Sequence, residues 1–126
     1  MQGNPVSWFE IYVDDLPRAK SFYESVFAVT LEPIESPKGS ELEMLGFPSN
    51  MEQYGASGAI VKMENIKAGG NSTMVYFSCE DCAVEEARVE AAGGKVQQSK
   101  FSIGPYGYIS LLIDSEGNMI GLHSML

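Results

Sequence analysis

Hydrophobic and polar positions alternate along several short stretches of this chain, which is typical of half-buried β-strands. Residues 8–13 have one apolar face, formed by Phe9, Ile11 and Val13. Their other face mixes aromatic and acidic groups: Trp8, Glu10 and Tyr12. Residues 74–79 alternate in the same way. We therefore expect sheets with one face on the core and a second, mixed face that is free to bind a ligand.

Two stretches follow the helical period instead. The first is predicted at residues 16–26, where Asp15 is placed to accept the free N–H groups of the first turn and the apolar residues form one stripe. The second is predicted at residues 82–92, with Asp81 as its cap. Gly93 and the glycine after it are expected to end this helix.

Strand-like segments follow each predicted helix and are separated by turns rich in Gly, Pro and Asn. They lie at about residues 28–34, 41–46, 57–64, 94–100, 107–113 and 118–125, with one of the turns at Pro37-Lys38-Gly39. The order βαβββ is thus written twice, about half a chain apart. The predicted fold class is α+β, with two βαβββ modules forming a curved mixed sheet around a cavity and the helices outside.

Length and composition restrict the class of protein. The chain has 126 residues, 44% of them hydrophobic, which suits a single domain with module one at about residues 5–66 and module two at about 72–126. A net charge of −9 argues against a nucleic-acid partner or an anionic membrane and is consistent with a cationic ligand. No stretch reads as a membrane span or a secretion signal, so we expect a cytoplasmic protein.

Three segments resemble, in order and spacing, the glyoxalase/bleomycin-resistance/dioxygenase proteins, the vicinal-oxygen-chelate superfamily. They read FEIYVDDLPRAKSFYESVF, VYFSCEDCAVEEARVEAAGGKV and DSEGNMIGLHSM. The resemblance covers essentially the whole chain and implies a glyoxalase-like domain that binds a small molecule and forms a homodimer. It leaves the activity open, because this fold hosts lyases, dioxygenases, epimerases, thiol transferases and drug-sequestering proteins.

The resemblance also implies metal ligands on the first and last strands of each module, and this chain has other residues there. Three of the positions fall on Trp8, Met74 and Gly121, and a fourth falls among apolar residues. None of the three placed side chains can bind a hard divalent ion. The chain has a single histidine, His123, so two histidines and a carboxylate cannot be assembled from one chain. We therefore expect no metal cofactor.

The mixed faces supply the candidate site residues. Glu10 is the candidate general base or partner of a cationic ligand, and His123, which shares a face with Gly121, is the candidate acid. The candidate ligand-binding residues are Trp8, Tyr12, Tyr76, Tyr108 and Ser110.

These residues fit two functions. The first is a protein that binds a small aromatic or cationic ligand. The alternative is a lyase-like or isomerase-like enzyme that uses Glu10 and His123. An all-carboxylate Mg²⁺ or Mn²⁺ site that includes Glu10 stays open.

Cys79 and Cys82 form a Cys-x-x-Cys motif where a predicted strand meets a predicted helix, the setting of redox-active thiols. A helix N-terminus favours a thiolate, but the acidic Glu80 and Asp81 between the two cysteines oppose it. We interpret the pair as structural, and a redox role remains the alternative.

Overall fold

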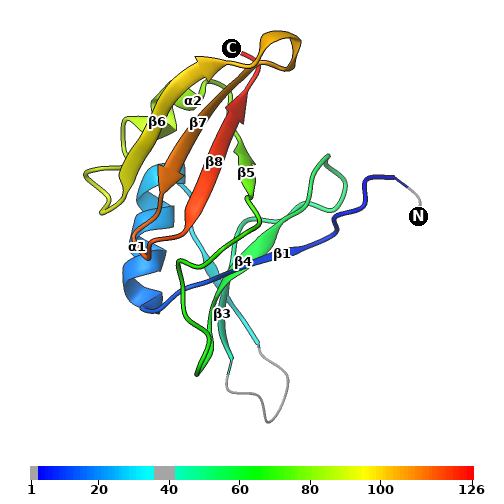
Figure 1. The fold of residues 1–126 in the computed structure, drawn as a ribbon. Helices are drawn as coiled ribbons and strands as arrows, with labels where there is room; N and C mark the ends of the chain where they lie inside the picture. Colours follow the sequence, from blue (N-terminus) through cyan, green and yellow to red (C-terminus); the bar gives the residue numbers. More distant parts are fainter. Residues whose placement is uncertain (1–2, 36–41) are drawn as a thin grey trace.

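The computed structural model describes residues 3–35 and 42–126, so the predicted turn at Pro37-Lys38-Gly39 lies outside the described residues. The chain folds into two βαβββ modules, each with a four-stranded mixed sheet. Figure 1 shows the second module's sheet above the first, with the helix of the first module beside both. The α+β fold of two modules is therefore confirmed.

The first module contains β1 (Phe9–Tyr12), α1 (Leu16–Phe27), β2 (Glu32–Ile34), β3 (Glu43–Gly46) and β4 (Gly58–Lys62). Its strand order is β1-β4-β3-β2. β1 runs parallel to β4, and the other pairs are antiparallel. β1 is consequently an edge strand.

The second module repeats this topology with β5 (Tyr76–Ser78), α2 (Cys82–Glu86), β6 (Lys95–Ser102), β7 (Tyr108–Ile113) and β8 (Met119–Ser124). Its order is β5-β8-β7-β6, with β5 parallel to β8, so β5 is again at an edge. A short 3-10 turn, η1 (Gly104–Tyr106), joins β6 to β7. Within residues 3–35 and 42–126 no strand pairing joins the two sheets, so the eight strands form two sheets.

The helix α1 forms where the sequence predicts it. The Asp15 carboxylate accepts the Arg18 N–H at 2.9 Å, which satisfies a free donor of the first turn. The predicted stripe is buried and consists of Ala19, Phe22, Tyr23 and Val26. The helix ends at Ala28, whose left-handed backbone (φ 53°, ψ 46°) turns the chain toward β2.

The helix α2 is shorter than predicted, because regular α-helix stops at Glu86 rather than near residue 92. Beyond it the chain continues in tight turns, in which the N–H of Arg88 and that of Val89 bond carbonyls only three residues back. No helix in the part of the chain that the structure describes is long and apolar enough to cross a membrane.

One core joins the two modules. The α1 side chains Phe22 and Tyr23 are fully buried and reach the second module. Phe22 lies so close to Gly94 that a Cβ there would be 2.4 Å from a ring carbon. Tyr23 contacts the ring of Phe77 with centroids 6.0 Å apart. Because α1 packs on both modules, the position of one module on the other is fixed by the core.

Candidate functional site

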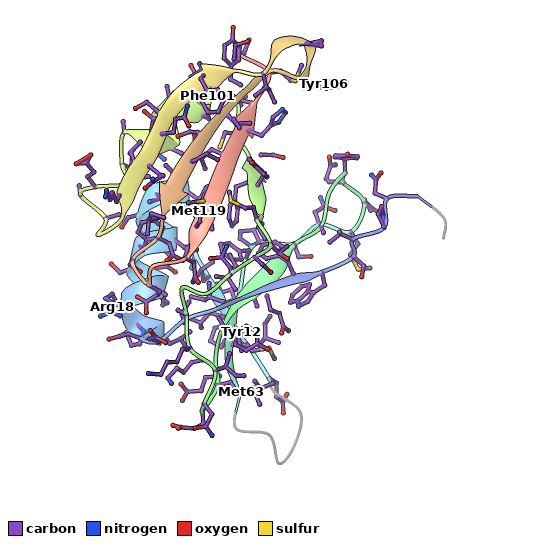
Figure 2. All side chains as sticks on the ribbon, in the orientation of Figure 1. Tyr12, Arg18, Met63, Phe101, Tyr106 and Met119 are labelled. Atoms are coloured by element: carbon purple, nitrogen blue, oxygen red, sulfur yellow. The ribbon has the colours of Figure 1, made fainter. Side chains whose placement is uncertain are left out.

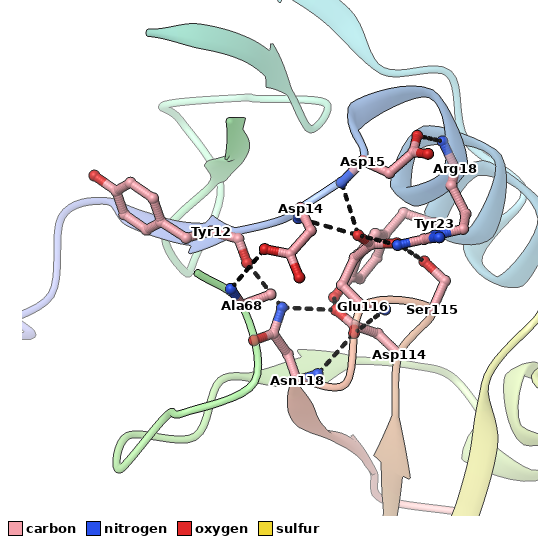
Figure 3. A network of polar contacts seen from close by, with 10 residues as sticks. All are labelled: Tyr12, Asp14, Asp15, Arg18, Tyr23, Ala68, Asp114, Ser115, Glu116 and Asn118. Carbon is pink, nitrogen blue, oxygen red and sulfur yellow. Dashed lines mark hydrogen bonds and ion pairs between the residues drawn. The ribbon is translucent and has the colours of Figure 1, made fainter. Parts of the chain in front are cut away.

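A polar turn between β7 and β8 ties the two modules together (Figure 3). The buried Glu116 carboxylate accepts the N–H groups of Asp14 and Asp15 at 3.0 and 2.9 Å and binds the Arg18 guanidinium at 2.7 and 2.9 Å. Burial alone would raise the pKa of the Glu116 carboxyl, but the hydrogen bonds from Arg18 and Asp15 hold this pKa below its ordinary value. The turn of module two thus pairs its buried carboxylate with Arg18 and satisfies two backbone N–H groups of the loop that begins α1.

Asp114, in the same turn, connects the turn to the buried Tyr23 of α1. Its carboxylate accepts the Tyr23 hydroxyl at 2.5 Å and the N–H groups of Glu116 and Asn118 at 2.8 and 2.9 Å. Burial and the Asp114 charge raise the pKa of Tyr23 well above its ordinary value, so the phenol stays a donor. These bonds are structural, and they fix the start of β8 against α1.

Two asparagines attach the connecting segment 66–73 to both modules. Asn118 donates to the Tyr12 carbonyl at 2.9 Å and accepts the Gly69 N–H at 2.7 Å. Asn71 donates to the carbonyls of Thr73 and Met119 at 2.9 and 3.0 Å. Segment 66–73 is therefore held as a fixed wall rather than left as a loose linker.

This wall, β1 and the start of β8 enclose a cavity of about 260 Å³, here called the junction cavity. Its polar lining includes Glu10, Tyr12, Lys67, Asn71, Thr73 and Asn118, and its apolar lining includes Ile11, Ile66, Val75 and Ile120. Both modules thus contribute to one concave site.

Glu10 is exposed on the mixed face of β1, and its carboxylate is oriented by its neighbours. Trp8 donates its indole N–H to Oε2 at 3.3 Å, and Tyr12 donates its hydroxyl to Oε1 at 3.2 Å. Burial, together with the Glu10 charge and hydrogen bond, raises the pKa of Tyr12. The arrangement presents one negative charge flanked by two aromatic rings, which is a surface that attracts cations.

A second cavity, of about 270 Å³ and here called the β8 cavity, is lined by Tyr76, Ile103, Ile109 and His123. His123 Nε2 lies 2.6 Å from the Tyr106 carbonyl oxygen. A carbonyl only accepts, so Nε2 is the protonated nitrogen. Tyr106 lies at the tip of the β6–β7 hairpin (Figure 2). The hydrogen bond from His123 therefore holds this tip against β8.

The structure separates some of the predicted site residues. Glu10 lines the junction cavity and His123 lines the β8 cavity, and each is hydrogen-bonded to other partners. Trp8 and Tyr12 lie beside Glu10, whereas Tyr76 lies beside His123. Within one chain, therefore, Glu10 and His123 do not form the acid–base pair suggested by their faces.

The expectation that Tyr108 and Ser110 line the ligand cavity does not match their positions. Ser110 is fully buried and donates to the Glu86 carboxylate at 2.7 Å, on the side of β7 covered by α2. The Tyr108 ring is on the same side, under the Lys100 ammonium at 4.8 Å from its centroid. Alternation shows that Tyr108 and Ser110 share a face of β7, and it does not show that α2 covers this face.

Residues of segment 66–73 were missed by the sequence patterns. Lys67, Asn71 and Thr73 line the junction cavity, although the sequence marks this stretch merely as a Gly-Gly-Asn turn. A turn signal shows where the chain bends, and it does not show which strand the bend will cover.

The residues at the implied metal positions do not fit a divalent ion. Trp8 offers an indole, Met74 a thioether, and Gly121 no side chain. The ring of Tyr76 covers Gly121 so closely that a Cβ there would lie 2.4 Å from two ring carbons. Across the described ranges 3–35 and 42–126, no group of three His, Cys, Asp or Glu side chains is arranged to hold a metal.

The Cys-x-x-Cys motif is placed at the base of α2. Cys82 is fully buried and Cys79 is partly buried. Burial and, after it, the Glu85 carboxylate raise the pKa of the Cys79 thiol to about 12. A thiol with this pKa is a poor nucleophile at neutral pH, which favours the structural interpretation.

Comparisons with solved structures give the same fold. A hypothetical protein from S. aureus aligns over 98% of this chain and 99% of its own, with a TM-score of 0.66 and 16% identity. TnmS3, an antibiotic binding protein from Streptomyces sp. CB03234, aligns over 98% of both chains, with a TM-score of 0.65 and 23% identity. Glyoxalase I from Zea mays reaches a TM-score of 0.74 at 17% identity, with 96% of this chain covering 46% of that one.

The sequence matches no curated protein. It does match a family model, that of the Glyoxalase/Bleomycin resistance protein/Dioxygenase superfamily, over residues 6–122. This match reaches from the first module into the last strand of the second, and it includes every residue that lines the junction cavity. The chain therefore belongs to the Glyoxalase/Bleomycin resistance protein/Dioxygenase superfamily.

Proposed function

We propose that this protein binds a small aromatic or cationic molecule in the junction cavity, without a metal ion. The observation that carries the proposal is the Glu10 carboxylate, which Trp8 and Tyr12 orient at the wall of a cavity of about 260 Å³. A carboxylate beside two aromatic rings suits an ammonium group by charge and by cation–π attraction. A fold neighbour described as an antibiotic binding protein supports a binding role.

The test is a titration of the ¹⁵N-labelled protein with 2-phenylethylamine, a small aromatic cation, followed by NMR. We expect the amide signals of the cavity wall, such as those of Gly69 and Gly70, to shift. Glu10→Gln is expected to weaken binding about fivefold, because it removes one charge contact. Glu90→Gln, an exposed substitution outside the cavity, is the matched control and is expected to change nothing. Equal binding by wild type and Glu10→Gln would refute the proposal.

The metal-free part of the proposal is tested separately. It is supported by the indole, the thioether and the missing side chain at Trp8, Met74 and Gly121. We expect elemental analysis of protein purified without chelators to find no stoichiometric divalent metal. One equivalent of bound Zn²⁺, Ni²⁺, Mn²⁺ or Mg²⁺ would refute it and would point to a carboxylate site that includes Glu10.

Catalysis by Glu10 is the second candidate, favoured by one observation: the carboxylate lies at a cavity wall and holds a hydrogen bond to the Tyr12 phenol. This geometry offers a base with a nearby proton donor. Chemical change of a bound ligand, followed by NMR, that disappears in Glu10→Gln while the fold survives would assign an enzyme. Unchanged ligand after long incubation would leave binding as the function.

We also propose that the protein is a homodimer. β1 and β5 are both open edges. Large apolar side chains are exposed near the first of them: Met51 lines a hollow with Trp8, and Tyr54 lines one with Val6, just before β1. This chain aligns with less than half of the maize glyoxalase I chain, which leaves room there for a second such unit. Sedimentation equilibrium is expected to give twice the chain mass, and the double substitution Met51→Ser, Tyr54→Ser is expected to weaken association. A monomer at all concentrations would refute this.

A further inference from the structure

The junction cavity presents two charges of opposite sign. Glu10 lines it from β1, and Lys67 lines it from segment 66–73. Both side chains are exposed. Among the residues that the structure describes, neither forms an ion pair. A positive and a negative group are therefore both available to whatever enters the cavity.

The backbone that carries each charge is fixed. On the lysine side, the N–H of Ala68 bonds the Asp14 carboxylate at 3.0 Å and the N–H of Gly69 bonds Asn118 at 2.7 Å. On the other side, β1 is locked in its ladder with β4. Because the backbone is fixed on both sides, only the two side chains need to be ordered when a ligand binds, which lowers the entropic cost of binding.

The space between the charges is partly apolar. Ile11 and Ile120 are almost fully buried beneath the cavity, and Ile66 and Val75 also line it. At about 260 Å³ the cavity is slightly smaller than the roughly 300 Å³ at which drug-sized pockets begin. The occupant must accordingly be small and must bring an apolar part together with its charges.

A purely cationic ligand would satisfy Glu10 and face the Lys67 ammonium without compensation. A purely anionic ligand would satisfy Lys67 and meet both Glu10 and the field of a chain with net charge −9. A molecule with both charges meets neither penalty. We infer that the junction cavity takes a small apolar zwitterion, of the class of a free amino acid with an aromatic or aliphatic side chain. This inference rests on the proposed function and narrows its ligand class.

The experiment compares three probes that share a phenyl ring: L-phenylalanine, 2-phenylethylamine, which lacks the carboxylate, and 3-phenylpropionate, which lacks the ammonium. Each is titrated into the ¹⁵N-labelled full chain and followed by NMR. We expect L-phenylalanine to bind about threefold to fivefold more tightly than the amine, the gain of one exposed ion pair. The carboxylate alone is expected to bind most weakly.

Lys67→Gln is the decisive variant. It is expected to lower the affinity for L-phenylalanine to that of the amine, and to leave or slightly improve binding of the amine. Lys95→Gln, on β6 and outside the cavity, is the matched control and is expected to behave as wild type. Both substitutions are at exposed positions, so both variants are expected to fold.

The outcomes separate the two proposals. If the amine binds and depends on Glu10, but L-phenylalanine gains nothing or ignores Lys67→Gln, the zwitterion inference is overturned and the proposed function stands. If no probe shifts the cavity amides in the wild-type protein, both are overturned. If the wild type prefers L-phenylalanine, and this preference is lost in Lys67→Gln but kept in Lys95→Gln, the zwitterion inference and the proposed function are both supported.

Discussion

The ring of Tyr76 covers Gly121, its partner in the parallel β5–β8 pair. A Cβ at position 121 would lie 2.4 Å from two carbons of this ring, which is closer than a real contact allows. The Tyr76 ring can therefore take this position only because residue 121 has no side chain. The ring takes the space where the family resemblance places a carboxylate, and it forms part of the β8 cavity.

Gly121→Ala is therefore expected to lower the free energy of unfolding by roughly 1 kcal/mol. The cost is at the low end for overpacking because Tyr76 is 47% exposed and its ring can rotate into solvent. In a Tyr76→Ala background the same substitution has nothing to displace and is expected to be nearly neutral. Urea unfolding of the four proteins of this double-mutant cycle measures the difference, and an equal cost in both backgrounds would contradict the packing explanation.

Glu116→Gln is expected to destabilise the protein in a pH-dependent way. At pH 7 the loss is expected to be roughly 2 to 3 kcal/mol, because a buried carboxylate that accepts the charged Arg18 donors is replaced by a neutral amide. The folded-state pKa of Glu116 lies below its ordinary value of 4.5. The ionised Glu116 carboxylate therefore gives its full contribution to the free energy of unfolding above about pH 4.5. This contribution disappears as the pH falls through the lower, folded-state pKa.

Denaturant unfolding of wild type and Glu116→Gln between pH 7 and pH 3 tests this. The gap between the two proteins should be constant down to about pH 5 and should narrow below it. Glu90→Gln, at an exposed position, serves as the control and should track wild type throughout. A gap that stays constant down to the lowest pH would show that the Glu116 charge does not stabilise the fold.

Cys79 is expected to resist alkylation in the native protein. With a pKa of about 12, roughly one thiol in ten thousand is a thiolate at pH 8. Iodoacetamide should therefore label neither Cys79 nor the fully buried Cys82 until urea unfolds the chain. After burial, the Glu85 charge is the largest cause of the raised pKa of Cys79. Glu85→Gln removes this charge and is expected to speed labelling of Cys79. Rapid labelling of native wild type would restore the redox interpretation of the motif.

Much of the fold could be predicted because its signals are local. The alternation in residues 8–13 and the cap at Asp15 depend on neighbours within one element, and both are found as expected. The end of α2 was not predictable in this way. The chain beyond Glu86 keeps turning, but the N–H groups of Arg88 and Val89 already bond carbonyls three residues back. A few residues later Gly94 packs against Phe22, which belongs to the other module and so leaves no local signal.

The candidate site was harder to predict because it depends on how the two modules pack. Glu10 and His123 each face the mixed side of their own sheet, yet they line different cavities. Alternation places Ser110 and Tyr108 on one face of β7, and only the packing of α2 shows that Glu86 is the partner of Ser110 there. Lys67 carries no local signal, since only the fixed position of segment 66–73 brings it to the cavity that Glu10 also lines.

The end of α1 offers a stability prediction with an internal control. Ala28 has a left-handed backbone, which costs an L-residue roughly 1 to 2 kcal/mol and costs glycine nothing. Ala28→Gly recovers this strain but loses roughly 0.4 to 1 kcal/mol by making the unfolded chain more flexible. The net expectation is a gain of about 0.5 to 1 kcal/mol.

Ala87 is the residue that follows the last turn of α2, as Ala28 is for α1, but its backbone has right-handed helical angles (φ −64°, ψ −17°). Ala87→Gly recovers no strain and keeps the entropic loss, so it is expected to destabilise by about 0.5 to 1 kcal/mol. Both alanines are exposed, so packing changes little in either variant. Thermal unfolding should therefore shift in opposite directions for the two substitutions. Shifts of the same sign would mean that the backbone angle at Ala28 does not determine how α1 ends.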